Sequence, residues 1–440
     1  MGVAQTLYTG VTGLSVNADG MAVVANNIAN ANAKGFKKDR AEFEDILAID
    51  LNGGSAGQIG RGARLGDVRT IHSQGGMKVT DNLTDLAIQG SGFFVVTNPS
   101  KDVNETAGKS YSRVGNLHFD KDGYFATPSG GRVQGFMADG KGVLSSKLTD
   151  VRIETNTIAP RATETLTLNV QLDARAKVIQ EPFSTAATDK TSNFSTTATV
   201  FDSYGKSHQN TIFFRKTAAS AEGVEWEWHS LVDGKEVTDS DPGVEWKEIG
   251  MGKIKFDKFG LLLDEQQSVT SANFANGALP NQQIKVDFGQ NVGVEAGRGI
   301  GASTSIAGDS VTTFHQQDGY EAGQIKSLDI GQDGKVTGVF TNGVQRVLAG
   351  IALATFPNEI ALLKLGKNLF SDSIESGPAN IGLAQTGTRG SLYSSTLEES
   401  NVDLASEFVD MITTQRLFQA NSRSITTADG MLEEVINLKR

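Results

Sequence analysis

The sequence contains no cysteine. This absence excludes disulfide bonds, thiolate catalysis and cysteine-based metal sites together. The chain has 5 histidines, which lie far apart, and no two of them show the His-x-x-x-His spacing of a zinc-binding helix. We therefore expect no metal and no cofactor.

Basic residues are also fewer than acidic ones. The chain has 40 Lys and Arg and 51 Asp and Glu, which gives a net charge of −11. This balance argues against a nucleic-acid-binding surface. The chain has no apolar run of the roughly 18 residues that a membrane span requires. Its first 33 residues lack Lys and Arg, so the basic segment of a secretory signal peptide is missing. We expect neither nucleic-acid binding nor membrane insertion.

Recognisable catalytic motifs are missing as well. Residues 90–92 (Gly-Ser-Gly) lack the spacing of a nucleophile elbow. The final glycine in residues 297–301 comes one place too early for a dinucleotide fingerprint, and the glycine-rich stretch 52–66 lacks the Gly-Lys-Ser/Thr ending of a phosphate loop. A glycosidase-like carboxylate pair is left as an open alternative. The sequence nevertheless predicts that the protein is not an enzyme.

Glycine, in contrast, is abundant, with 50 residues spread along the chain. Asp-Gly and Asn-Gly pairs between apolar runs predict hairpins, for example at residues 122–123, 139–140 and 333–334. Leu166, Leu168, Val170 and Leu172 alternate with polar residues, as in a half-buried strand. We predict a first β domain over 71–165 and 321–386. A second, outer β domain, a sandwich or a barrel, is inserted at 166–320.

The two chain ends carry heptad-spaced apolar residues, which predict a long amphipathic helix at each terminus. Each helix needs an apolar partner, and the other helix or its copy in a neighbouring molecule can supply one. The expected fold is α+β and multidomain: paired terminal helices of coiled-coil type (1–36 and 397–440), connecting segments (37–70 and 387–396) and two nested, mainly antiparallel β domains. The predicted assembly residues are Leu7, Val11, Leu14, Met21, Ile28, Leu404, Met411, Phe418, Ile425 and Leu432.

The N-terminal helix should be weak in isolation. Gly10, Gly13 and Gly20 lie inside it, and each costs roughly 1 kcal/mol relative to Ala. We expect it to be disordered in the free subunit and to order when neighbours supply apolar surface. The alternative is an ordinary helix docked on its own domain. We further expect the helix to end near Asn32, with Gly35 as its left-handed cap, and a short second helix over 40–51.

Residues 26–36 carry a motif that includes Asn26, Asn27, Asn30, Gly35 and Phe36. It resembles the N-terminal signature of bacterial flagellar rod and hook proteins. The match is inexact at position 34. In the family this position is commonly Thr, and one further residue separates that Thr from the glycine. Further segments similar to the family are 86–94, 111–116, 122–124, 200–205, 400–404, 415–416, 419–421 and 437–440.

Rod members of the family are generally shorter and mostly lack an outer domain, so a chain of 440 residues resembles the hook members. The resemblance implies a structural subunit that self-assembles into a flexible helical tube, which transmits motor torque to the filament as a universal joint. A distal-rod subunit is the alternative within the family. A wall hydrolase and a surface adhesin on the same termini are alternatives from other classes.

The resemblance also implies partners and a location. The subunit would form a homopolymer and meet a hook cap protein, a distal rod protein, a hook–filament junction protein and the flagellar type III export apparatus. It would be extracellular, in the hook or basal body of the flagellum, and exported without a cleaved signal peptide. The terminal helices would form the inner tube. Glycine-containing connections near 52–66 and 387–390 would act as compliant joints.

Overall fold

The computed structural model describes residues 2–46, 49–50, 58–98, 108–153, 157–238, 240, 244–269, 271–275, 277–290 and 301–438. The chain forms two compact units, and each is described separately. The first comprises Met1–Thr155, Ser327–Val339 and Gln345–Arg440, and the second comprises Asn156–Lys326 and Phe340–Val344. The second unit thus begins about ten residues before the predicted inserted domain of 166–320.

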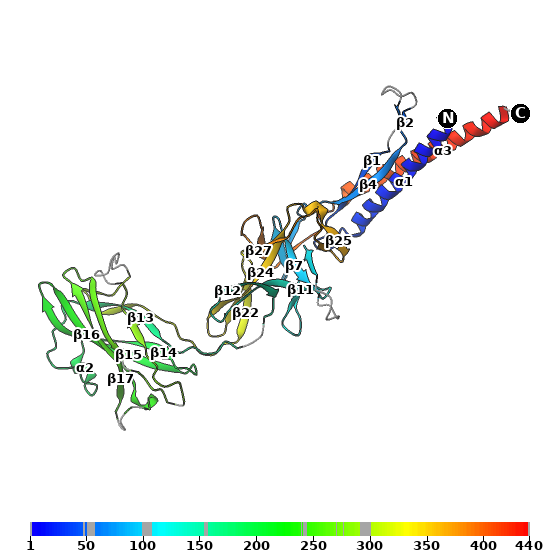
Figure 1. The fold of residues 1–440 in the computed structure, drawn as a ribbon. Coiled ribbons are helices and arrows are strands. Elements are labelled where there is room, and N and C mark those ends of the chain that lie inside the picture. The colour runs from blue at the N-terminus through cyan, green and yellow to red at the C-terminus, as the bar shows by residue number, and fades with distance from the viewer. Residues whose placement is uncertain are drawn as a thin grey trace. The chain divides into compact units, whose positions relative to one another are not determined.

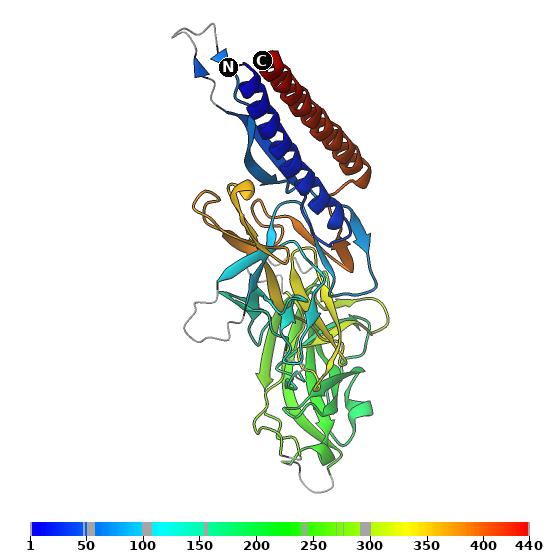
Figure 2. The same cartoon turned by 90° about the vertical axis from the view of Figure 1, so that its right-hand side faces the viewer.

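The first unit contains two long helices, one near each end of the chain. α1 spans Gly2–Ala29 and α3 spans Leu404–Leu438. They lie side by side in both views, blue and red in Figures 1 and 2, and they pack against one another. α1 ends at Ala29, three residues before the predicted end. None of the described helices is both long enough and apolar enough to cross a membrane.

A two-stranded hairpin follows α1 and packs along it. Its strands are β1 (Asp39–Asp45) and β4 (Ala63–Thr70), which pair antiparallel from Asp39 opposite Thr70. The predicted helix over 40–51 is therefore wrong. The cross-strand hydrogen bonds to β4, formed with residues distant in sequence, override the local preference. β2 (Ile49–Asp50) pairs with β3 (Gln58–Ile59), and residues 52–57 of the predicted flexible connection lie outside the described residues.

A 12-stranded sheet forms the body of the first unit, in the order β22-β23-β24-β11-β7-β8-β26-β25, with β9, β10, β12 and β27 attached beside it. From β23 to β25 along this order every pair is antiparallel. Phe93, Tyr111, Phe356 and Phe370 contribute the aromatic rings of its hydrophobic core, which also contains Val95. The strands are β7 (Phe93–Thr97), β8 (Lys109–Ser112), β9 (His118–Phe119), β10 (Phe125–Ala126), β11 (Arg132–Ala138), β12 (Leu144–Asp150), β22 (Ile325–Ile330), β23 (Lys335–Phe340), β24 (Gln345–Thr355), β25 (Leu363–Gly366), β26 (Leu369–Ser371) and β27 (Asn380–Leu383), with a 3₁₀ turn η2 at Glu359–Ala361.

Two further strand pairs join the predicted connecting segment 387–396 to this unit. β28 (Ser391–Ser394) pairs with β6 (Leu86–Gln89), and β29 (Thr396–Glu398) pairs with β5 (Met77–Val79). A Cβ on Gly390 would lie 2.1 Å from the carbonyl oxygen of Gln89, so this glycine permits close backbone approach. The segment before α3 is thus held by backbone hydrogen bonds.

The second unit is a β sandwich around one core. A 5-stranded sheet, β14-β15-β16-β17-β18, packs on a 4-stranded sheet of β13, β19, β20 and β21. The predicted alternating residues of β13 are all buried, and they face Trp226 and Trp228. The elements are β13 (Thr165–Asp173), α2 (Thr188–Thr191), β14 (Phe194–Phe201), β15 (Ser207–Ser220), β16 (Gly223–Asp233), η1 (Gly234–Glu236), β17 (Trp246–Asp257), β18 (Leu262–Val269), β19 (Lys285–Asp287), β20 (Thr304–Ile306) and β21 (Val311–Gln317).

Candidate assembly surface at the terminal helices

The face of α1 that packs on α3 is made of small residues. A Cβ added to Gly10 would lie 2.7 Å from Cγ1 of Ile425, and one added to Gly13 would lie 2.8 Å from Nδ2 of Asn421. Gly10 and Gly20 are buried. The glycines that weaken the isolated helix therefore let α3 approach closely.

The predicted apolar stripe of α1 is only partly covered within one chain. Val11 is 56% exposed, and Leu7, Leu14, Met21 and Ile28 are only partly buried. Glycine at positions 10 and 13 permits a shorter distance between the two helices. The role of the stripe residues between subunits stays a prediction.

The stripe of α3 is divided between two environments. Met411, Ile425 and Leu432 are half-buried along the side that meets α1. Leu404 and Phe418, in contrast, are exposed. The described part of the helix pair also exposes further large apolar side chains, namely Tyr8, Phe408, Val409, Ile412, Leu417, Met431 and Ile436. One chain thus leaves much apolar helix surface open to solvent.

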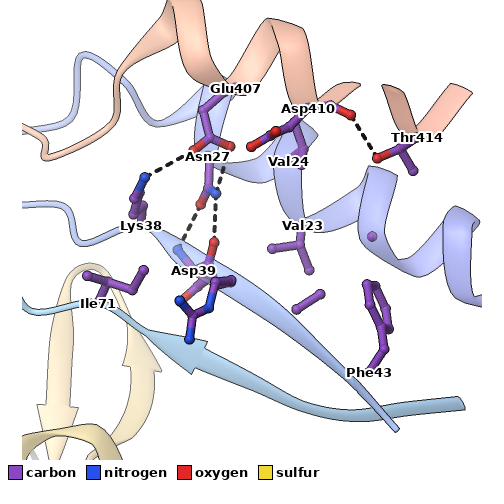
Figure 3. A pocket seen from close by; sticks show the side chains of 13 residues that line it. Val23, Val24, Asn27, Lys38, Asp39, Phe43, Ile71, Glu407, Asp410 and Thr414 are labelled. Atoms are coloured by element: carbon purple, nitrogen blue, oxygen red, sulfur yellow. Dashed lines mark hydrogen bonds and ion pairs between the residues drawn. The ribbon is translucent and has the colours of Figure 1, made fainter. Parts of the chain in front are cut away.

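A groove of about 220 Å³ runs between α1, β1 and α3. At one end the Asn27 amide bridges all three elements, as Figure 3 shows. Its Nδ2 donates to the carbonyl oxygen of Asp39 at 2.8 Å and to Glu407 Oε2 at 3.1 Å, and its Oδ1 accepts from the Asp39 N–H at 2.9 Å. Lys38 pairs with Glu407 at 3.6 Å. The groove is lined by Gly20, Val23, Val24, Asn27, Lys38, Asp39, Arg40, Ala41, Phe43, Ile71, Glu407, Asp410 and Thr414.

A buried charge cluster lies where the helices meet the β body. Lys37 Nζ contacts Glu398 Oε1 at 2.6 Å, and neither side chain is exposed. Arg113 contacts the other oxygen of Glu398 at 3.4 Å, and the Gly75 N–H donates to Oε1 at 3.0 Å. Burial lowers the pKa of Lys37 and of Arg113, and Glu398 opposes both shifts. The carboxylate therefore joins the segment after α1 to the segment before α3 and to the sheet.

Asn401 closes the same junction from the C-terminal side. Its Oδ1 accepts from the Lys38 N–H at 2.7 Å, and its Nδ2 donates to the carbonyl oxygen of Ile71 at 2.8 Å. Like Asn27, it satisfies backbone groups where the regular strand pairing ends. Together the two amides tie both terminal segments to the β1–β4 hairpin.

The structure gathers the motif residues Asn26, Asn27, Asn30, Gly35 and Phe36 around this junction. Asn30 Nδ2 donates to the carbonyl oxygen of Asn26 at 2.9 Å, and Phe36 is buried. Gly35 is left-handed (φ 65°), and a Cβ there would lie 2.8 Å from the carbonyl carbon of Arg113. Gly35 is not the cap of α1, because the helix has already ended, but it lets the chain turn against the sheet.

Sequence reasoning missed the charged members of this junction. Arg113, Glu398, Asn401 and Glu407 were given no individual role. The sequence did contain an indication for two of the charged members. Lys37 and Arg113 each lie in or beside a motif segment and next to residues that are buried in the fold. Pairing them with Glu398 requires the fold, since 285 residues separate Arg113 from that carboxylate.

His72 lies near the same cluster, and its surroundings lower its pKa. Its ring packs edge-on against Phe93 and Phe370, with centroids 5.5 and 5.4 Å away. Burial, and after it the charges of Arg113 and Lys37, lower the pKa of His72 to about 4. Within the described residues no group of three His, Asp or Glu side chains could hold a metal ion.

The sequence matches curated relatives along nearly its whole length. The flagellar hook protein FlgE of Treponema pallidum is 32% identical over 99% of this chain and 100% of its own. That of Borreliella burgdorferi is 31% identical over 99% of both chains. This chain belongs to the flagellar hook protein family. The resemblance seen in the motif residues is thereby confirmed.

Family profiles divide this hook-family chain into matching segments. They are described as flagella basal body rod protein (residues 7–37), flagellar hook protein FlgE/F/G D1 domain (87–176), flagellar basal body protein FlaE D2 domain (171–320) and flagellar basal body rod FlgEFG protein C-terminal (393–438). A crystal structure of Helicobacter pylori flagellar hook protein FlgE2 covers 72% of this chain and 100% of its own, at 15% identity and a TM-score of 0.52. That likeness concerns the fold alone: mostly β domains, with a helix at each end of the present chain.

Proposed function

We propose that this chain is a structural subunit of the bacterial flagellar hook. In this proposal copies self-assemble into a flexible helical tube that transmits motor torque to the filament as a universal joint. The observation that carries it is the large apolar side chains that the α1–α3 pair leaves exposed within one chain. The full-length likeness to hook proteins supports the hook over the distal rod.

Burial of these side chains by neighbours is the driving force that we propose for assembly. Complete burial of one large apolar side chain contributes roughly 1.5–3 kcal/mol, and several of them are half exposed or more in the single chain. A head-to-tail contact that repeats without closing produces a helical polymer. We propose that neighbouring helix pairs pack in this way, in a coiled-coil manner, to line the inner tube.

Torque transmission requires that force applied to the helices reaches the β domains. The junction of Asn27, Asn401 and the Lys37–Glu398–Arg113 cluster supports this role, because its hydrogen bonds and ion pairs join both helices to the sheet. A tube that bends lengthens on one side and shortens on the other during each rotation. We propose that contacts between the outer β domains of neighbouring copies are polar and slide.

The remaining assignments follow from the same proposal. The chain acts as a structural protein without enzymatic activity, outside the cell in the flagellum, after export without a cleaved signal peptide. Its partners are further copies of itself, the hook cap, distal rod and hook–filament junction proteins, and the type III export apparatus. The four-part domain division of the sequence and the assembly role of the ten predicted stripe residues are parts of this proposal.

Electron microscopy of polymers grown from the purified full-length chain tests the proposed function. We expect hollow tubes that are curved and adopt a range of curvatures. Straight, rigid tubes would instead favour the distal-rod alternative. Failure of the chain to assemble at any concentration or salt condition that keeps it folded would contradict both.

A further inference from the structure

The helix groove, defined as the groove between α1, β1 and α3, has an apolar floor. Val23 and Val24 on α1 and Phe43 on β1 form that floor, and Phe43 is 48% exposed. Gly20 lets the ring pack against the backbone of α1, because a Cβ there would lie 3.2 Å from Phe43 Cζ. Asp410 and Thr414 of α3 form the opposite wall, as Figure 3 shows. The groove is therefore a slot for apolar side chains between polar walls.

The same chain carries a protruding counterpart. Leu404, Phe408 and Ile412 are spaced four residues apart on α3, and all three are exposed. Side chains four residues apart line one face of a helix. We call these three residues the α3 ridge.

Phe408 and Ile412 lie on the side of α3 opposite the groove residue Asp410, and Leu404 lies about 120° around the helix from Asp410. Each residue turns a helix by about 100°, so Phe408 and Ile412, both two residues from the groove residue Asp410, project roughly 160° away from it. A ridge cannot fill the groove of its own chain. It is free to enter the groove of a second copy.

The α3 ridge and the helix groove also have similar lengths. The ridge spans residues 404–412, about 12 Å of helix, and the groove runs along α1 from Gly20 to Asn27, about 11 Å. A copy that has a groove on one flank and a ridge on the other makes two different contacts with two neighbours. Such a contact is heterologous and continues as an open helix.

We propose that the α3 ridge of one copy packs in the helix groove of the next copy. This contact rests on the proposed function, since it names the partner surfaces by which the helix pairs associate. It assigns Val23, Val24 and Phe43 to the receiving surface, and none of these is among the predicted stripe residues. Phe408 and Ile412 supply the inserted side chains.

Disulfide trapping between two single-cysteine variants tests this pairing. The natural chain has no cysteine, so any disulfide joins the introduced residues. Full-length Val24→Cys and Ile412→Cys proteins are mixed, co-assembled and oxidised, and non-reducing gels are run. We expect a disulfide-linked dimer from the mixed polymer and much less from either variant alone. Val24→Cys mixed with Leu417→Cys is the control, because Leu417 is also exposed on α3 but lies on another flank.

Polymers of the mixed variants that give no more cross-linked dimer than the Leu417→Cys control would overturn the pairing and leave the proposed function intact. Failure of the natural chain to polymerise would instead overturn the proposed function.

A second measurement does not depend on introduced cysteines. Phe408→Ala with Ile412→Ala should raise the critical concentration for assembly about tenfold or more. Ile374→Ala, which removes an exposed apolar side chain from the β body, should change it less than about twofold. Equal critical concentrations for the two would also overturn the pairing.

Discussion

Lys37 and Glu398 form an ion pair of 2.6 Å in which both side chains are fully buried, although 361 residues separate them in the sequence. Arg113 and the Gly75 N–H occupy the remaining positions around the carboxylate. Two cations thus share one buried anion at the junction between the terminal helices and the sheet. Removal of Glu398 leaves two buried cations without their shared anion, whereas removal of Lys37 leaves Glu398 paired with Arg113.

Glu398→Gln should therefore destabilise the first unit strongly, because Lys37 and Arg113 both lose their buried counter-charge. Breaking a buried pair from one side typically costs about 3–5 kcal/mol, and the measurement is the free energy of unfolding from denaturant titration of the full-length chain. Lys34→Ala provides the control, because its pair with Glu399 at 3.2 Å is partly exposed and should contribute less than about 1 kcal/mol. Similar losses in the two variants would show that the cluster has no special role.

The glycines of α1 should resist substitution where they contact α3. Gly10→Val places Cβ 2.7 Å from Ile425 Cγ1, and such overpacking typically costs about 1–3 kcal/mol. Gly430→Ala on α3 meets no atom within 4 Å, and it should stabilise that helix by about 1 kcal/mol. Thermal melting of assembled polymers, followed by circular dichroism, measures both. A stabilising effect of Gly10→Val would contradict the observed helix packing.

His72 should make the first unit sensitive to acid. Its folded-state pKa of about 4 lies below the 6.5 of the unfolded chain, so the unfolded state binds a proton more readily. Above pH 6.5 His72 does not make the free energy of unfolding depend on pH. Between pH 6.5 and about 4 it lowers the free energy of unfolding by up to about 1.4 kcal/mol per pH unit. Denaturant titrations of His72→Leu should show a smaller loss over this window. His118→Leu, at an exposed site, should keep the loss of the natural chain.

The sequence predicted the elements whose signal is local. The alternation of β13 and the presence of long terminal helices could be read from periodicity alone, and so could turns such as that at Gly334, whose φ is 79°. The β1 strand could not be predicted from local periodicity. Its partner β4 begins 18 positions after β1 ends, and the hydrogen bonds to β4 decide its conformation. The packing role of the α1 glycines was also missed. Heptad rules favour large apolar residues, whereas this helix pair uses glycine for close approach.

The motif residues could be found by resemblance, but their physical task could not. Asn27 gives no hint in the sequence that it bridges β1 and Glu407, because that carboxylate is 380 residues away. The same holds for Glu398, whose neighbours Glu399 and Asp403 are similar in the sequence and differ only in burial. Buried polar junctions are defined by tertiary contacts, which is why composition and periodicity do not predict them.

The central claim is that the terminal helices drive assembly while the β domains fold without them. Its most direct test is a comparison of the full-length chain with a variant that lacks residues 1–30, by electron microscopy under the same assembly conditions. We predict tubes from the full-length chain and none from the shortened one, which should still show the cooperative unfolding of its β domains. Tubes of normal diameter from the shortened chain would contradict the account.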